Sequence, residues 1–334
     1  MIIHICLQWE YLNVNTNEWG QLKKVIVGVA DNAKVPEIDI SLRCVNYADK
    51  NDETEIITGP YPQRVIDEAN QDLDVFCKFL QDESIEVLRP DRTDCKYYNY
   101  CPRDSVFIHG ELTMATPMPI RARRGEWRAF EQHLDNPVNI RCYHESALYN
   151  LDCIGNKDIL ALNEFEPAFD AANCLRANED VLYLVSNSGN KLGASLLQGA
   201  LGERAKVRKL QDVYSFMHID STIAFLREGL LLANPDRIKS KNDLPAPFNK
   251  WDIIFCPEPV DIGHYPKWCN ASKWINMNLF SVNTKLVALE EHQEPLRVVL
   301  EQHGFECAML PMRHQRTLGG GFHCVTLDVK RDVS

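Results

Sequence analysis

The chain has 334 residues, of which 45% are apolar and 25% charged, a composition typical of a soluble globular protein with a substantial core. Its formal net charge of −11 argues against a nucleic-acid partner, which would call for a basic face. No apolar run reaches membrane-spanning length, and the short apolar start at 1–6 lacks the charged beginning of a signal peptide. We therefore predict a cytoplasmic protein without a membrane partner.

The chain contains twelve cysteines, and they are scattered along the sequence without any C-x-x-C pair. Such a pair would have indicated a zinc site or a redox dithiol. No other metal-ligand spacing and no phosphate-binding loop occurs. We therefore expect reduced thiols, no metal and no cofactor.

The first strand is predicted at 22–29, and a long polar loop follows from Asp31 to about Pro62. Residues 64–82 repeat their apolar positions with the period of an amphipathic helix. A short strand at 85–88 completes this first part of the chain.

The same order of elements then recurs, with two strands joined by a turn, a connecting segment and one further strand. The predicted strand pairs are 105–115, 170–186, 218–233 and 275–290; helices follow at 124–134, 193–201 and 294–303, and single strands at 138–143, 205–210, 251–256 and 306–310. A last strand at 322–329 is expected to pair with the strand that begins at residue 22.

These five units have a period of about 50–65 residues, and units that cannot bury their own apolar face usually stack into an array. A doubly wound sheet is the alternative, but it needs single strands alternating with helices. We predict an α/β fold of one domain spanning 1–334, a five-bladed α/β propeller closed by its two ends.

Three consecutive glycines, 319–321, lead into Cys324. Glycine allows close approach of the backbone to a ligand, and we expect Gly321 to keep side chains clear of a bound substrate. A thiol at the end of such a turn is placed like a nucleophile, although most cysteines are simply small buried hydrophobes. The nucleophile hypothesis therefore requires an activating base nearby.

In a closed array the start of each first strand points toward the central axis. His218 and Asp220 are two residues apart and would project from one face of a strand. The polar residues at these starts are Asp104, Asp170, His218, Asp220, Ser272 and Cys324.

Carboxylates of this kind fit a planar guanidinium group, whose donors form a fixed fork. A thiolate could attack the guanidinium carbon while His218 moves protons. Arg237 follows in a turn and could hold a substrate carboxylate. The ordinary alternatives are a satisfied His–Asp pair and a solvated turn arginine.

Several motifs resemble the amidinotransferases of the guanidine-modifying, or pentein, superfamily, whose best-known member is glycine amidinotransferase. The resemblance runs in order from about residue 17 to residue 331. Its motifs are Pro102-Arg103-Asp104, 117–123, Phe169-Asp170-Ala171-Ala172, Met217-His218-Ile219-Asp220, 234–237, Ser272-Lys273-Trp274 and 319–324. The superfamily's fold is the five-bladed α/β propeller, which agrees with the unit count.

The resemblance implies catalytic roles for three residues. Cys324 would be the nucleophile, His218 the general acid and base, and Asp170 its orienting partner. The family takes an amidino group from L-arginine, releases L-ornithine and passes the group to a primary amine through an amidino-cysteine. It uses no metal or organic cofactor, and it leads us to expect a homodimer.

The resemblance also implies how the donor is held. Asp104 and Asp220 would bind the guanidinium group, while Arg237 and Ser272 would bind the carboxylate of arginine.

Departures from glycine amidinotransferase concern the acceptor. Ala271 stands where that enzyme has a second serine, and Asn173 where it has a second aspartate. The segment before His218 also differs, which makes Ser215 and Met217 candidates for choosing the acceptor. Glycine is therefore an unfavourable acceptor.

The stretch 169–180 resembles amidinotransferases of cyanobacterial toxin pathways. The saxitoxin-type acceptor, an amine on a polyketide-like intermediate that already carries a guanidine, is our prediction. The cylindrospermopsin-type enzyme, which uses glycine, is the alternative. Two other classes stay open: a deiminase-like hydrolase, in which water replaces the amine, and a non-catalytic guanidine-binding module.

Overall fold

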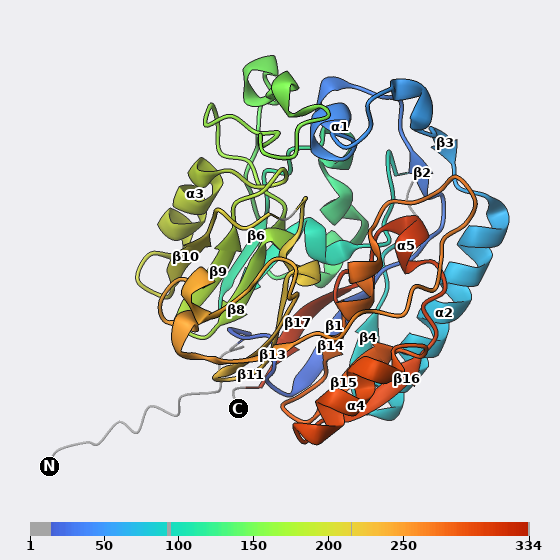
Figure 1. The fold of residues 1–334 in the computed structure, drawn as a ribbon, viewed down its shortest axis with the longest axis vertical. Helices are drawn as coiled ribbons and strands as arrows, with labels where there is room; N and C mark the ends of the chain where they lie inside the picture. The colour runs from blue at the N-terminus through green and yellow to red at the C-terminus, as the bar shows by residue number, and fades with distance from the viewer. Residues whose placement is uncertain (1–14, 92–94, 215, 333–334) are drawn as a thin grey trace, which may run out of the picture.

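Five three-stranded sheets and one two-stranded sheet make up the β structure of residues 15–91, 95–214 and 216–332, the part that the computed structural model describes (Figure 1). The middle strand of each three-stranded sheet pairs antiparallel with one neighbour and parallel with the other. Within each three-stranded sheet, neighbouring strands lie in the following order: β17 (Thr326–Arg331), β1 (Leu22–Val27), β4 (Glu86–Leu88); β5 (Val106–His109), β6 (Leu112–Ala115), β7 (Val138–Asn139); β8 (Cys174–Ala177), β9 (Asp180–Leu184), β10 (Lys206–Leu210); β11 (Ile223–Arg227), β12 (Leu230–Ala233), β13 (Asp252–Phe255); and β14 (Phe280–Ser281), β15 (Leu286–Glu290), β16 (Glu306–Leu310).

The pairing expected between the two ends of the chain is present. β17 runs antiparallel to β1, with Leu22 opposite Arg331 and Val27 opposite Thr326. In Figure 1 the two strands lie side by side near the centre of the view, one red and one blue. The sheet that carries the last strand therefore depends on residues from both ends.

Three helices make the crossovers that parallel strand pairs need. α2 (Gln63–Asp82) joins β1 to β4, α3 (Lys191–Leu201) joins β9 to β10, and α4 (Glu294–Gln302) joins β15 to β16. Their bounds confirm the predicted helices to within two residues, and in Figure 1 they lie toward the outside. None of the helices in the described ranges is long and apolar enough to cross a membrane.

Two predictions about the segments between the strands are wrong. Residues 31–62 were expected to be an irregular loop, yet they form α1 (Ile40–Val45) and the small sheet of β2 (Lys34–Val35) and β3 (Gly59–Pro60). Asp39 caps α1 by accepting a hydrogen bond from the backbone N–H of Leu42 at 2.9 Å. The predicted helix 124–134 is instead two short 3₁₀ turns within Glu126–His133, broken at Phe130.

The predicted starts of the first strands are 3₁₀ turns, not strands. Polar, turn-favouring side chains precede the apolar run of each strand, and they compete locally for the backbone. His218 and Asp220 are therefore not neighbours on one strand face. The turns are Pro102–Asp104 before β5, Ala171–Asn173 before β8, Ile219–Ser221 before β11 and Lys273–Met277 before β14.

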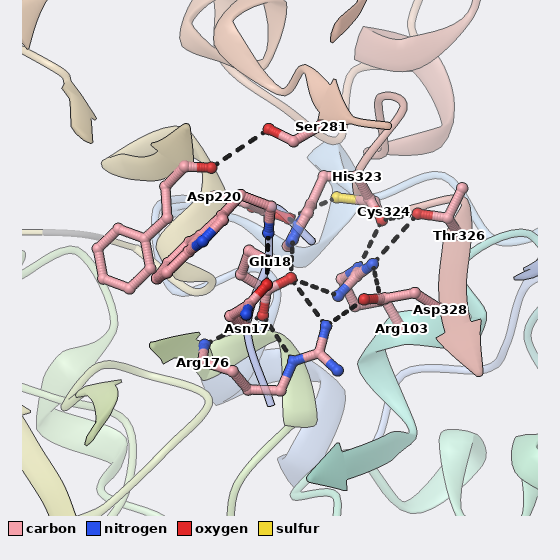
Figure 2. A network of polar contacts seen from close by, with 12 residues as sticks. Asn17, Glu18, Arg103, Arg176, Asp220, Ser281, His323, Cys324, Thr326 and Asp328 are labelled. Atoms are coloured by element: carbon pink, nitrogen blue, oxygen red, sulfur yellow. Dashed lines mark hydrogen bonds and ion pairs between the residues drawn. The ribbon is translucent and has the colours of Figure 1, made fainter. Parts of the chain in front are cut away.

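A buried cluster of charges ties these units together around Asp328 in β17 (Figure 2). Its carboxylate accepts hydrogen bonds from Arg103 Nη2 and Arg331 Nε, both at 2.6 Å, and from Arg176 Nη2. Arg176 Nε also donates to Glu18 Oε1 at 2.8 Å. One carboxylate thus joins guanidinium groups from the turn before β5, from β8 and from β17.

We expect Asp328→Asn to destabilise the protein strongly, because it leaves three buried guanidinium groups short of one negative charge. Breaking a buried ion pair by neutralising one partner costs about 3–5 kcal/mol of the free energy of unfolding. Urea denaturation measures this loss. Asp82→Asn is the matched control, since Asp82 pairs with Lys78 on the exposed face of α2 and should leave the midpoint nearly unchanged. Equal midpoints for the two variants would contradict the anchoring role of Asp328.

Candidate active site

One pocket of about 380 Å³ brings together most of the residues singled out in the sequence. Asp104 and Asp170 are buried outside its lining and contact it through His218. Ser215 lies outside the described residues. The predicted residues that line the pocket are Met217, His218, Asp220, Arg237, Ala271, Ser272 and Cys324.

Cys324 lies in the turn before β17, and its side chain is almost fully buried. Its Sγ donates to Asp220 Oδ2 at 2.9 Å and accepts from Asn278 Nδ2 at 3.1 Å. Asn278 Oδ1 also accepts from the backbone N–H groups of His323 and Cys324, at 2.8 and 3.2 Å. Sequence reasoning missed Asn278, although it follows a turn equivalent to those that carry Asp170 and Asp220.

The thiol of Cys324 is protonated in the free protein. Its hydrogen bond with Cys101, its burial and the negative charge of Asp220 all raise its pKa well above the ordinary value. Asp220 behaves in the opposite way. Burial would raise its pKa, but the hydrogen bond and charge of His323, then the charge of His218, hold it well below the usual range. A neutral thiol therefore donates to an ionised carboxylate.

His218 is held between two buried carboxylates. Its Nε2 lies 3.0 Å from Asp170 Oδ2, and its Nδ1 lies 3.7 Å from Asp104 Oδ1. Burial lowers the pKa of His218, but the charge of Asp104 and the hydrogen bond and charge of Asp170 outweigh it and raise the pKa to about 9. The ring is thus a cation at neutral pH and can donate a proton.

The loop around Asp170 explains how that carboxylate is aimed. The Asp170 backbone N–H donates to Ser188 O at 2.9 Å. Asn173, which departs from glycine amidinotransferase, holds the same loop by accepting from Ser188 Oγ at 2.8 Å and donating to Ser186 Oγ at 2.9 Å. Asn173 is buried and supports the site without lining the pocket.

Asp104 is positioned by Arg123, which sequence reasoning placed only within a motif. Arg123 Nη1 donates to Asp104 Oδ2 at 2.9 Å, and its Nε donates to Glu126 Oε2 at 3.0 Å. The guanidinium lies 4.9 Å from the centre of the Tyr98 ring and itself lines the pocket. Asp104 therefore acts on the pocket through His218 and Arg123.

Arg237 and Ser272 line the pocket from two other turns. Arg237 Nη1 donates to Ser221 Oγ at 2.9 Å and to Thr222 Oγ1 at 2.7 Å, and burial lowers its pKa. Ser272 is exposed and caps the turn before β14 by accepting from Trp274 N at 3.3 Å. The fork of Arg237 is thus fixed by the same turn that carries Asp220.

The glycine run does not serve the purpose expected of it. A Cβ atom on Gly321 would lie 2.9 Å from both Asn278 Cβ and Gln315 Oε1, and one on Gly320 would lie 2.5 Å from Cys101 Sγ. Gly319 lines the pocket at φ +83°, whereas Gly321 is absent from its lining. The glycines let the turn that carries Cys324 pack tightly against Cys101 and Asn278, so the expectation that Gly321 clears space for substrate is wrong.

Within the described residues, one group of side chains is close enough to hold a metal ion. It consists of Glu290, Glu291 and His292, at and after the end of β15. None of the three lines the pocket that contains Cys324.

Comparison with known proteins gives relatives along almost the whole chain. No protein-family model matches. Inosamine-phosphate amidinotransferase 1 of Streptomyces glaucescens is 40% identical over 95% of this chain and 96% of its own length. L-arginine:L-lysine amidinotransferase of Pseudomonas savastanoi pv. phaseolicola is 30% identical over 94% of this chain and 93% of its own.

Solved structures agree with these relatives. Inosamine-phosphate amidinotransferase of Streptomyces griseus superposes with a TM-score of 0.92 at 38% identity, covering 97% of each chain. An amidinotransferase of saxitoxin biosynthesis from Microseira wollei superposes with a TM-score of 0.86 at 27% identity, covering 97% of this chain and 98% of its own.

The electrostatics of His218 can be measured directly. We expect its ring to titrate near pH 9 in the wild type, and at a lower pH in Asp170→Asn, because the variant loses the carboxylate that favours the cation. Because the folded pKa is raised, the pairing stabilises the protein fully below about pH 6.5 and loses this contribution as the pH rises through 9. Histidine NMR follows the titration, and pH-dependent thermal unfolding follows the stability.

Asp252→Asn is the control for this titration, since Asp252 is exposed and pairs with Lys241. An unchanged His218 titration in Asp170→Asn would contradict the proposed electrostatic pairing.

Proposed function

Because the chain belongs to the amidinotransferase family, we propose that it transfers the amidino group of L-arginine to a primary amine through a covalent intermediate on Cys324, releasing L-ornithine. The observation that carries this proposal is the shared pocket of a protonated thiol, an ionised carboxylate and a cationic imidazole. No metal or organic cofactor has a part in these steps.

Asp220 is the residue that would bind the guanidinium of arginine. It is ionised, lines the pocket and lies beside the thiol, which places a bound guanidinium carbon next to Cys324. Arg237 and Ser272 would bind the carboxylate of arginine at the other end. An arginine fork suits a carboxylate because it can donate two parallel hydrogen bonds.

The first half of the reaction uses both protons held in the pocket. The sulfur of Cys324 forms a bond to the guanidinium carbon while its proton passes to Asp220. The bond from that carbon to the Nε atom of the donor arginine breaks, and His218 donates its proton to the departing nitrogen. Ornithine leaves, and the amidino group stays on the sulfur as a cation.

The second half returns both protons. An acceptor amine attacks the amidino carbon and gives a proton to His218, which is now neutral. The carbon–sulfur bond breaks, and Asp220 returns its proton to the sulfur. The high pKa of the thiol favours this step, because the sulfur readily takes the proton back.

We further propose that the five three-stranded sheets are the five blades of a single-domain propeller. Their identical strand layout and the pairing of β17 with β1 support a closed ring. In this arrangement the turns before the first strands meet on the axis, which would explain why three of them contribute lining residues to one pocket.

For the acceptor we propose an amine on a phosphorylated aminocyclitol. Identity to the inosamine-phosphate enzyme of Streptomyces glaucescens is 40%, against 27% to the saxitoxin-pathway structure. Lys50 and Arg316 line the pocket and could approach an acceptor phosphate. The saxitoxin-type, guanidine-bearing acceptor stays a prediction from the sequence.

The covalent step predicts that wild-type protein releases ornithine from arginine in the presence of an acceptor, and that Cys324→Ala releases none. Mass spectrometry should find an amidino group on Cys324 when arginine is supplied alone. Cys307→Ala is the control, since this cysteine lies in β16 outside the pocket. Turnover by Cys324→Ala would overturn the mechanism, and citrulline in place of ornithine would indicate the hydrolase.

The acceptor is tested with a panel of amines, with arginine as donor. We expect an aminocyclitol phosphate to react faster than glycine by about tenfold or more, a difference of about 1.4 kcal/mol in the barrier. Agmatine, a primary amine that carries a guanidine, represents the saxitoxin-type acceptor. A higher rate with agmatine than with the aminocyclitol phosphate would favour that class instead.

A further inference from the structure

His323 precedes Cys324 in the chain, does not line the pocket that contains Cys324, and lies next to Asp220 and Glu18 (Figure 2). Its Nδ1 is 3.3 Å from Asp220 Oδ2, and its Nε2 is 3.6 Å from Glu18 Oε2. Its backbone is fixed as well, because His323 N donates to Asn278 Oδ1 at 2.8 Å and Arg103 Nε donates to His323 O at 2.7 Å. The ring is buried and has little freedom to turn away.

Both carboxylates beside the ring are ionised. Burial would raise the pKa of Glu18, but the charge and the hydrogen bonds of Arg176 help to hold it well below its usual range. Asp220 is ionised for the reasons given above. Nδ1 of His323 is within hydrogen-bond distance of Asp220, whereas Nε2, 3.6 Å from Glu18, has no hydrogen-bond partner among the described residues. The ring therefore lies within ion-pair range of two negative charges, and Coulomb attraction to both carboxylates favours a positive charge on it.

A cation at this position bears on the chemistry at sulfur. The ionised carboxylate of Asp220 opposes loss of the Cys324 proton, because deprotonation would place the negative thiolate next to it. A positive charge beside Asp220 offsets one of these two negative charges. It also fixes the carboxylate oxygen that accepts the thiol proton at 2.9 Å.

We propose that His323 is a positioning residue, held as an imidazolium between Glu18 and Asp220, which aims Asp220 at the thiol and offsets the charge that forms on sulfur. This role rests on the proposed function, because it concerns the residue that makes the covalent intermediate. His323 contacts the thiol's proton acceptor and does not contact substrate in this scheme.

Other charged and titratable groups also face His323 and Cys324, from the turn before β5, from β8, from the turn before β11 and from the segment before β1. They are Tyr100, Cys101, Arg103 and Asp104; Arg176, which donates at 2.9 Å to the Glu18 oxygen that faces His323; His218 and Asp220; and Glu18. His323 is the group among them that faces carboxylates with both of its ring nitrogens and touches the proton acceptor of Cys324.

The test is the pH dependence of alkylation of Cys324 by iodoacetamide, read from the mass of the peptide that contains it. His323→Asn keeps a hydrogen-bond donor near the Nδ1 position but has no charge. We expect its alkylation midpoint to rise by about one pH unit, and ornithine release near neutral pH to fall about tenfold and recover as the pH rises. Affinity for arginine should change much less than the rate.

His303→Asn is the matched control, because His303 is exposed at the end of α4 and its Nδ1 lies 2.8 Å from the backbone oxygen of Val299, far along the chain from Cys324. Its alkylation midpoint should equal that of the wild type. The exposed Cys269 is an internal standard in every sample, and its alkylation profile should not move.

An unchanged Cys324 midpoint in folded His323→Asn would overturn the proposal. If that variant does not fold, His323→Gln, which keeps a donor near the Nε2 position, decides in the same way. Histidine-selective ¹⁵N NMR of the wild type supplies an independent measurement, and a neutral His323 ring at pH 7 would also overturn it. Alkylation needs neither arginine nor an acceptor, so absence of ornithine release from the wild type would refute the proposed function separately.

Discussion

The carboxylate of Asp328 is the constraint on which the site depends. It gathers Arg103, Arg176 and Arg331 in the buried interior, and these three side chains come from three different units. Arg103 also donates to the backbone oxygen of His323, one residue before Cys324. Because β17 carries Asp328 and the turn before it carries Cys324, the interaction that joins these three units also helps to hold the turn of the thiol.

Burial of Cys324 next to Asp220 fixes the position of the thiol but also makes its proton harder to remove. A buried thiol next to a carboxylate keeps its proton, so Cys324 should react slowly in the alkylation and oxidation reactions that need the thiolate. A guanidinium cation placed beside Asp220 would lower the cost of removing that proton. The nucleophile would then be generated only where its substrate lies, which is a consequence of charge rather than of motion.

The sequence predicted the repeated unit, and which residues gather at one pocket, better than it predicted their local geometry. Long periodic segments such as 64–82 and the strand at 306–310 were placed almost to the residue. The turns that carry Asp170 and Asp220 were mistaken for strand starts, because their hydrogen bonds are local and leave no periodic pattern. Asn278, Arg123 and Glu18 could not be found in advance, since their importance lies in partners distant along the chain.

His218 and Asp220 show why a list of site residues is an incomplete description of the mechanism. Both are buried in one turn, yet their surroundings move their pKa values in directions that leave each one charged at neutral pH. Asp104 and Asp170 make the imidazole a proton donor, while His323 makes the carboxylate a proton acceptor. The neighbours of His218 and Asp220 thus decide which of the two holds a proton and which can accept one. The same residue types with those partners exchanged would have the opposite protonation states in the pocket, and neither half of the proposed transfer could begin.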